Sequence, residues 1–412
     1  MNSQLIYWLW LTAAFGPANS RKWNTMSHYA SVKEAYESIS RGNLEFVMPQ
    51  DIRGVKSADI ERVQKLVEYC KSKRINIYCF DDDKYPAWLR EIYNPPSVLF
   101  AAGDISVVND SVVIACVGTR TPSEYSIKVT ERICGELADA GVVIASGMAP
   151  GLDSIALKAG IKAGGKVVSV LPCGLFYDYP KNSSAFKKAV SGNGVVISEF
   201  FPNEPSLGVN FLARNRILSG ISMGTLITQA GEKSGALSTA SFALGQGKDI
   251  FCISPHELYS DTYSGVTGLI RDGAIPVFDA RDVLNEYYSV YAHKLNHNSL
   301  ILRQKSREGI FSENAKKPVK ASKQSAPEKE VQPKQPQENV NNSGSIPKVK
   351  VINTDGMSEE KKKIIEFVSG SGAVHFDDIA SFADWSEDVE TMLTDLELDG
   401  YIKSLSGNRY TI

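Results

Sequence analysis

The sequence predicts an α/β fold: an extended, Rossmann-like, doubly wound core, with a helical N-terminal domain before it and a C-terminal winged-helix domain after it. Two observations predict the core. Between about residues 111 and 280, short runs rich in β-branched residues alternate with helix-like segments, and such apolar runs are typical of parallel strands buried on both faces. Glycine and other small residues directly follow several of these runs, as in the strand-to-helix turns of this fold class.

Residues 1–85 are predicted to form a helical domain of the SAM or helix-hairpin kind. Ile60, Val63, Leu66 and Val67 recur at the three- and four-residue spacing of a helix face. The apolar stretch 5–16 is shorter than the roughly 20 residues that a membrane span needs, and no basic residue precedes it. We therefore expect a core helix there, no membrane association and a cytoplasmic protein.

The core is expected at residues 86–290, with its strands in the apolar runs VVIACV, VVIASG, KVVSVLP, GVVISE, GTLITQA, DIFCIS and IPVFD. Residues 303–355 are rich in Lys, Gln, Pro and Glu, and we expect a flexible linker there. In the last segment, 356–412, we expect three short helices at 358–369, 376–382 and 386–398. A hairpin of 401–404 with 409–412 completes the plan of a winged helix.

Charge and composition restrict the function classes. The formal net charge is −2, from 45 basic and 47 acidic residues, so a nucleic-acid site would have to be a local patch. Six cysteines occur without CxxC spacing, which favours buried, reduced thiols. The five histidines are dispersed and no Walker A loop is present. We therefore expect no metal, no cofactor and no catalytic residues.

Two loops after predicted strands could hold a phosphate. In residues 118–125, Gly118 allows close backbone approach and Arg120 supplies a cation. In residues 146–156, Gly147 and Gly151 precede a helix, and a helix N-terminus attracts anions. Ordinary tight turns without a ligand are an equally weighted interpretation of the second loop. The sites expected in this second loop are Ser146, Gly147, Ala149 and Gly151.

The stretch 211–224 carries Arg214 and Arg216 on either side of Asn215, before an apolar segment. Two guanidinium groups at a helix start oppose the helix dipole unless an anion neutralises them. We interpret them as phosphate ligands. The alternative is an intramolecular ion pair with an acid such as Glu199 or Glu232.

Two further stretches are expected on the same side of the sheet. Residues 177–181 (YDYPK) place tyrosines beside Lys181 and Asn182, and aromatic rings next to cations suit single-stranded nucleic acids. Packed tyrosines with a solvated lysine are the alternative. Residues 231–241 repeat the pattern of small residues before a helix, with Ser234 and Gly235 as candidates.

The ordered set VGTRTPSEY, SGMAPGLD, DYPKN, VISEFFP, FLARNRILSGIS, EKSGALSTA and SGVTGLIRDGA resembles the DprA/Smf family of DNA-processing proteins over about residues 80–285. The resemblance implies a homodimer, formed through the Rossmann-like core, that binds single-stranded DNA without ATP. It also implies loading of the RecA recombinase during natural transformation. The DNA-contacting positions it implies are Arg120, Lys181, Arg214 and Arg216, with the phosphate pocket around Gly147 and Gly151.

The C-terminal segment should not bind duplex DNA. Residues 357–412 contain twelve acidic and five basic residues, and the segment expected to be the recognition helix, 386–399, has six acids and no Lys or Arg. Because phosphate attraction dominates affinity for DNA, we expect this domain to bind a protein partner or to regulate the core. This acidity also disfavours a duplex-binding transcription regulator.

The main alternative function is an enzyme, a nucleotide phosphoribohydrolase of the LOG type. A pocket containing Asp153, Glu199 and Arg216 could cleave a nucleotide. Against this, no PGGxGTxxE-like motif is present, and we interpret Asp153 as a first-turn residue favoured by the helix dipole rather than as a catalytic acid.

Overall fold

The computed structural model describes residues 4–296, 357–371, 374–382, 389–398, 401–405 and 409–411. It separates into two compact units, residues 1–303 and residues 304–412. The expected linker, 303–355, lies outside the described residues. The two units are described below one at a time.

The first unit is built on a nine-stranded sheet with the order β1-β2-β6-β5-β4-β3-β7-β8-β9. From β6 to β9 the neighbouring strands are parallel, whereas β1 and β2 pair with each other, and β2 with β6, in antiparallel fashion. The strands are β1 (Asn76–Cys79), β2 (Val98–Gly103), β3 (Val113–Val117), β4 (Val143–Ser146), β5 (Val167–Val170), β6 (Gly194–Ser198), β7 (Gly224–Ile227), β8 (Asp249–Ile253) and β9 (Ile275–Val277).

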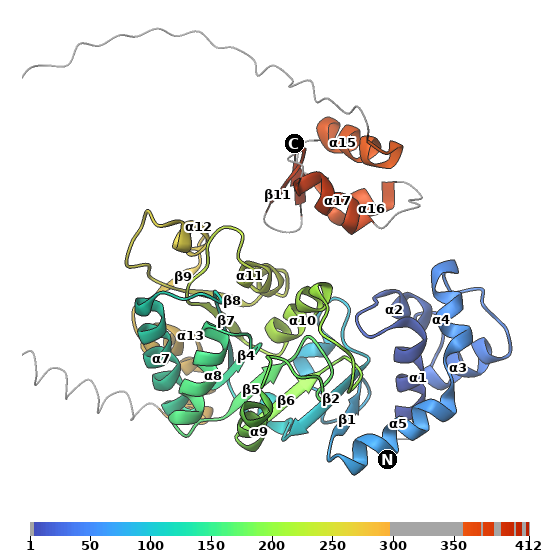
Figure 1. Ribbon diagram of the computed structural model, residues 1–412, viewed down its shortest axis with the longest axis horizontal. Helices are drawn as coiled ribbons and strands as arrows, with labels where there is room; N and C mark the ends of the chain where they lie inside the picture. The colour runs from blue at the N-terminus through green and yellow to red at the C-terminus, as the bar shows by residue number, and fades with distance from the viewer. Residues whose placement is uncertain are drawn as a thin grey trace, which may run out of the picture. The chain divides into compact units, whose positions relative to one another are not determined.

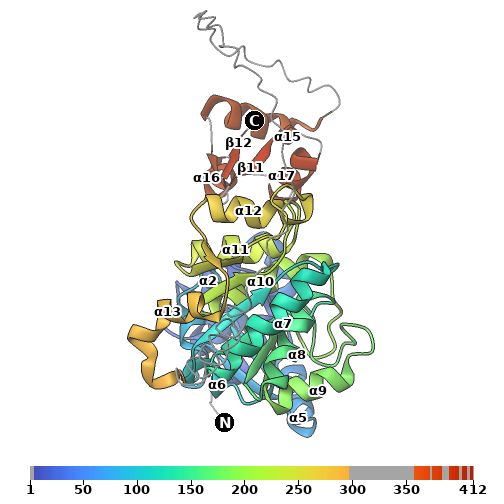
Figure 2. The same ribbon diagram turned by 90° about the vertical axis from the view of Figure 1, so that its left-hand side faces the viewer.

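Helices cover both faces of this sheet. One hydrophobic cluster joins one sheet face to α7, α8 and α13, and a second joins the other face to α10, α11 and α12. In Figure 1, α10, α11 and α12 lie above the strands, whereas α7, α8 and α13 lie at the lower left; Figure 2 shows α12, α11 and α10 one below the other. With α6 and α9, which belong to the same part of the chain, the helices are α6 (Ser106–Asp110), α7 (Glu124–Asp139), α8 (Leu152–Lys162), α9 (Ser184–Gly192), α10 (Gly208–Gly220), α11 (Ala236–Gly245), α12 (Ser264–Arg271) and α13 (Ala280–Tyr291).

The N-terminal helices gather beside β1 and β2, in blue in Figure 1. The apolar stretch expected to be a core helix forms α1 (Leu5–Phe15), whose Trp8, Leu9, Trp10 and Leu11 are buried, and that prediction is confirmed. The Thr12 and Ser97 hydroxyls, 2.8 Å apart, connect α1 to the residue before β2. The other helices here are α2 (Arg21–Met26), α3 (Val32–Ser40), α4 (Ile52–Ser57) and α5 (Ile60–Ser72).

The expected parallel strands are all found, as β3 to β9, so the Rossmann-like core is confirmed. The antiparallel edge was not expected. Strand β1 lies inside the segment 1–85 predicted to be helical, and it carries only four residues. So short a strand is defined by its pairing with β2 rather than by its own pattern.

The chain order creates a crevice next to β3. Strands β4, β5 and β6 follow one another on one side of β3, and the chain then returns to place β7, β8 and β9 on its other side. In doubly wound sheets, ligands bind at such a switch point, outside the carboxyl ends of the strands. The loops after β3, β4 and β7 meet here.

In the second unit, the described elements are α15 (Glu359–Ser371), β10 (Val374–His375), α16 (Phe376–Phe382), α17 (Val389–Leu398), β11 (Lys403–Leu405) and β12 (Arg409–Thr411). The strands pair in the order β10-β12-β11. Ile364, Ile379, Met392 and Leu396 are among the side chains of its separate core. This order agrees with the expected helices and hairpin, and the winged-helix assignment itself stays a prediction.

Two expectations from composition can be compared with the structure. All six cysteines lie within the first unit, and each is buried and free of disulfides, as expected for packed thiols. Within the described residues, no helix combines the length and the hydropathy that crossing a membrane requires.

Candidate functional site

A cavity of about 360 Å³ lies at the switch point. Its walls come from the loop after β3, the start of α8, the middle of α10 and the start of α11. The residues that line it are Val117, Gly118, Thr119, Arg120, Ala149, Asp153, Phe211, Arg214, Asn215, Ser234, Gly235, Ala236 and Thr239. Seven of the site residues predicted from the sequence therefore line this cavity: Gly118, Arg120, Ala149, Arg214, Asn215, Ser234 and Gly235.

Arg214 forms the buried wall of this cavity. Its Nη1 donates to the backbone carbonyl oxygens of Gly147, at 2.8 Å, and Val170, at 2.6 Å. Its Nε donates to Asn215 Oδ1 at 3.0 Å. Arg214 is thus held by the ends of β4 and β5, and its guanidinium is positioned before any ligand arrives.

The Asp153 carboxyl group binds the loop amides that the sequence predicts to bind a phosphate. Burial raises its pKa, whereas the Arg214 charge and hydrogen bonds from the backbone amides of Ala149, Gly118 and Gly147 act in the opposite direction. The expectation that the Gly147 and Ala149 amides hold an external anion is therefore corrected. These amides bind an internal carboxyl group, because Asp153 in the first turn of α8 lies within their reach.

The mouth of the cavity carries an exposed cation against aromatic rings. The Arg120 guanidinium carbon lies 5.1 Å from the centre of the Phe211 ring. The Tyr179 ring meets Phe211 edge-on, with centroids 5.3 Å apart. The YDYPK loop therefore reaches the cavity through Tyr179, and the expected combination of aromatic rings and cations is present there.

The start of α11 forms the opposite wall. Gly235 is the N-cap of this helix, and Ser234 precedes it. Asn215 Nδ2 donates to Ser238 Oγ at 2.8 Å, which connects α10 to the first turn of α11. Because the positive end of the α11 dipole faces the cavity, an anion beside Arg120 would be stabilised from both sides.

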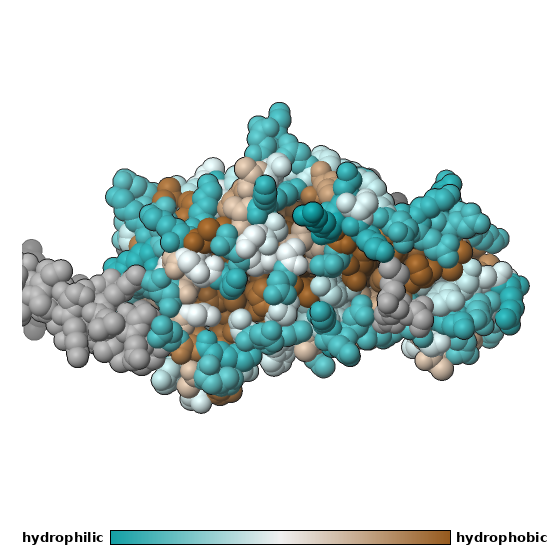
Figure 3. All heavy atoms as spheres, turned by 90° about the horizontal axis from the view of Figure 1, so that it is seen from below, coloured by the Kyte–Doolittle hydropathy of each residue, from teal (hydrophilic) through white to brown (hydrophobic). Residues whose placement is uncertain are grey.

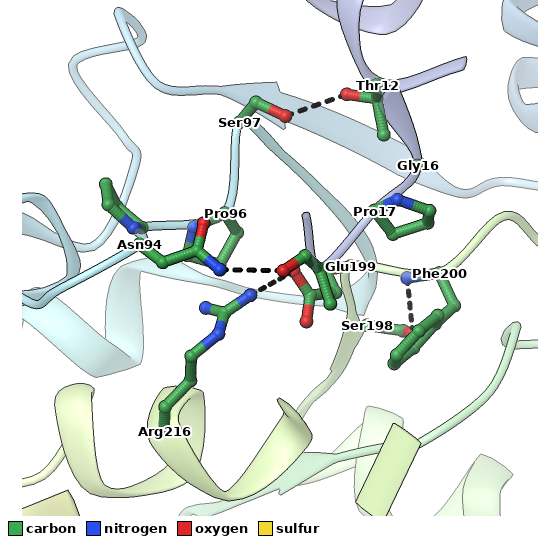
Figure 4. Close-up of polar contacts among 12 residues, drawn as sticks. Thr12, Gly16, Pro17, Asn94, Pro96, Ser97, Ser198, Glu199, Phe200 and Arg216 are labelled. Atoms are coloured by element: carbon green, nitrogen blue, oxygen red, sulfur yellow. Dashed lines mark hydrogen bonds and ion pairs between the residues drawn. The ribbon is translucent and has the colours of Figure 1, made fainter. Parts of the chain in front are cut away.

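Arg216 does not line the cavity. It is buried, and its Nη2 lies 2.5 Å from Glu199 Oε2, so the alternative of an intramolecular pair is what the structure shows (Figure 4). Positions two apart on a helix point about 200° away from each other, so Arg214 and Arg216 diverge. Both lie within α10, which begins at Gly208, and the expectation of two arginines at a helix start is corrected.

A third ionisable group, Lys22 of α2, lies near the Arg216–Glu199 pair. Lys22 is fully buried and donates from Nζ to the carbonyl oxygens of Gly16 and Pro17. Burial lowers its pKa to about 7, while Glu199 raises and Arg216 lowers it. Figure 4 shows Arg216 directed from α10 toward Glu199, with Pro17 close by. This cluster joins the N-terminal helices to the sheet.

The remaining predicted residues lie outside the lining. Ser146 Oγ donates to the Cys116 carbonyl at 2.6 Å between neighbouring strands. Gly151 has a φ of +91° and leaves no room for a Cβ, which would lie 2.5 Å from the Thr119 carbonyl oxygen. Lys181 and Asn182 are exposed on the loop before α9, and the Asn182 amide donates to Asp178 at 2.9 Å.

The sequence did not identify Val117, Thr119, Phe211, Ala236 or Thr239 as site residues. Asp153 was considered only as a first-turn residue of a helix or as part of the alternative enzyme pocket. Phe211 lies three residues before Arg214 and four before Asn215, and this spacing places all three on one helix face. The spacing becomes informative only when the helix is known to begin at Gly208, before Phe211. The position of Asp153 beneath the loop amides carried no comparable signal.

Replacing Gly147 with alanine should destabilise the first unit by about 1–3 kcal/mol. A Cβ at this position would lie 2.1 Å from Arg214 Nη1, and the guanidinium would have to leave its carbonyl partners. Chemical denaturation measures the effect. Gly135→Ala is the control, since its Cβ meets nothing within 4 Å and alanine favours a helix. Equal stabilities of the two variants would contradict this packing.

Among the residues that the structure describes, no cluster of three His, Cys, Asp or Glu side chains could hold a metal ion. Within the cavity, Asp153 is the only carboxyl group in the described lining. The cavity therefore offers cations, amides and aromatic surface rather than a ligand set for a metal.

Comparisons with known proteins agree with this geometry. A family model described as DNA recombination-mediator protein A matches residues 76–288. The chain is 34% identical over 225 residues to the DNA processing protein DprA of Bacillus subtilis, covering 55% of this chain and 75% of that protein. It is 36% identical over 206 residues to DprA of Streptococcus pneumoniae, covering 50% and 72%. The X-ray structure of the S. pneumoniae protein superposes with a TM-score of 0.59 at 28% identity, over 68% of this chain and 97% of that one.

Proposed function

Because this chain belongs to the DNA recombination-mediator protein A family, which is also the DprA/Smf family that its motifs resemble, we propose that it binds single-stranded DNA without catalysis. The binding site is the cavity at the switch point. The observation that carries the proposal is the exposed Arg120 guanidinium over the Phe211 ring, at a cavity walled by Arg214.

This arrangement matches the chemistry of a single strand. Arg120 and the start of α11 supply positive charge for one phosphate. Phe211, with Tyr179 against it, offers an aromatic surface on which an unpaired base can stack. A duplex hides its bases from such a surface, which favours single-stranded over double-stranded DNA.

The enzyme alternative loses support from the structure. The enzyme hypothesis requires Asp153, Glu199 and Arg216 in one pocket. Glu199 and Arg216 instead pair with each other away from the cavity. Asp153, the remaining acid, is buried and bonded to backbone amides. The matched family is described as a recombination mediator, which agrees with a binding protein rather than an enzyme.

The finer parts of the proposal rest on the family resemblance. We infer loading of the RecA recombinase onto the bound strand, a role in DNA uptake and natural transformation, and a homodimer formed through the Rossmann-like core in the cytoplasm. The acidic C-terminal unit is proposed to bind a protein or to regulate the core. Its Lys361 pairs with Asp395 at 2.8 Å, so part of its scarce positive charge is already engaged.

Arg120→Ala should weaken binding of a labelled strand of about 20 nucleotides about tenfold, because one charge-assisted phosphate contact is lost. The slope of log affinity against log salt should flatten by about 0.7, the value for one phosphate of a single strand. Fluorescence anisotropy over a salt series measures both. Lys166→Ala is the control, since Lys166 is exposed just before β5, at the amino ends of the parallel strands, whereas the cavity lies at their carboxyl ends. Equal losses in the two variants would refute a localised site.

A further inference from the structure

We propose that the DNA path continues from the cavity, across the loop before α9, onto helix α5 of the N-terminal region, where Tyr69 and Phe176 form a second aromatic platform. This inference rests on the proposed function and extends its site. It assigns to the N-terminal helices a share of the single-strand contact.

The two aromatic groups are connected through one short loop. Tyr179 contacts Phe211 at the cavity mouth, and its amide donates to the Tyr177 carbonyl at 2.9 Å. Lys187 donates to the carbonyl oxygens of Leu175 and Tyr177 and so fixes the loop against α9. The loop is therefore held in place between the cavity and Phe176.

Phe176 lies against Tyr69 of α5, with ring centroids 5.7 Å apart and planes at 75°. Both rings remain exposed, at 40% for Phe176 and 39% for Tyr69. A second cavity, of about 640 Å³, lies beside Phe176, and its lining includes Leu175, Tyr177, Asp178 and Lys187. Figure 3 views the molecule from the side on which α5 and α9 lie in Figure 1, and it shows hydrophobic patches between hydrophilic ones there.

The charges around this platform suit a phosphate backbone. Lys65 lies four residues before Tyr69, hence on its side of α5, and Lys73 is the C-cap residue that follows the helix; both are exposed. Lys181 is exposed on the connecting loop. The nearby acid Asp178 accepts hydrogen bonds from the Asn182 and Ser183 amides and is engaged within the loop. Aromatic rings between exposed cations are the chemistry of single-strand binding, and the platform continues from the proposed cavity.

The test compares strands of two lengths on the full chain. A strand of about 8 nucleotides should be held by the cavity alone, whereas one of about 20 nucleotides should reach α5, since single-strand sites span about 4–16 nucleotides. Tyr69→Ala should weaken binding of the long strand about 5- to 20-fold, as expected for one lost base stack, and leave the short strand unaffected. Tyr69→Phe should retain wild-type affinity.

Tyr288→Ala is the matched control, because Tyr288 on α13 is 37% exposed, much like Tyr69. A 5-iododeoxyuridine strand of about 20 nucleotides, photo-crosslinked to the wild-type chain, should label the peptide carrying Tyr69 or Phe176. Wild-type affinity of Tyr69→Ala and Phe176→Ala for the long strand, with no crosslink to either peptide, would overturn this inference while leaving the cavity intact. A wild-type chain that binds neither strand would instead overturn the proposed function itself.

Discussion

Replacing Glu199 with leucine is expected to lower the free energy of unfolding of the first unit by about 3–5 kcal/mol. Glu199 is the buried acid that compensates Arg216 and Lys22, both of which are buried as well. Removing it leaves the buried Arg216 guanidinium without a counter-charge, and it also removes the negative charge that favours protonation of Lys22. Urea denaturation of the single variant measures the loss.

Two controls separate this effect from the loss of a generic ion pair. Glu124→Gln breaks a pair with Lys128 of 2.7 Å that lies on the surface, with both side chains at least 70% exposed, and it should cost no more than about 0.5 kcal/mol. The double variant Glu199→Leu/Arg216→Met removes both members of the buried ion pair and should regain most of the stability. A double variant as unstable as Glu199→Leu alone would show that buried charge is not the cause.

Lys22 should make the stability of this unit depend on pH above neutrality. Its pKa is lowered to about 7 in the folded chain, first by burial, and it is about 10.5 when unfolded. Between these values the unfolded chain binds a proton that the folded chain does not, so stability rises with pH there. Each pH unit contributes about 1.4 kcal/mol, and the total approaches about 5 kcal/mol. Below pH 7 both states are protonated and the contribution is constant.

The measurement compares the wild type with Lys22→Met at several values between pH 6 and 10, so that all other titrating groups cancel. The methionine variant should be the more stable one at pH 6, because it avoids the burial of a charge. The wild type should gain on it by roughly 2–3 kcal/mol between pH 7.5 and 9.5. A constant difference across this range would contradict a buried, proton-releasing Lys22.

The core could be predicted because its strands are buried on both faces. Runs such as VVIACV and DIFCIS are apolar throughout, and a parallel sheet covered by helices requires that pattern. Strands β1 and β2 lie at the antiparallel edge, where β1 is only partly buried, and such a strand leaves a weaker pattern. The core helix α1 was predictable for the same reason as the sheet, since its side chains are apolar almost all round.

The candidate site was predictable in its location and only partly in its contacts. Glycines and small residues after β3, β4 and β7 indicated the loops that meet at the switch point, and the cavity lies there. Phe211 was missed because the arginines were taken to mark the start of this helix, whereas α10 begins six residues before Arg214, at Gly208.

Local pattern alone thus sufficed for the layered sheet, for the functional loops that follow its strands and for Arg120 in the first of them, because these depend on hydrophobic period and on small residues after each strand. Which partner each buried charge finds depends on side chains far apart in the sequence. Arg214 meets the carbonyls of Gly147 and Val170, Arg216 meets Glu199, and Asp153 meets the loop amides. A buried charge must be compensated by whatever the packed fold brings within reach, and that proximity exists only once the helices lie on the sheet.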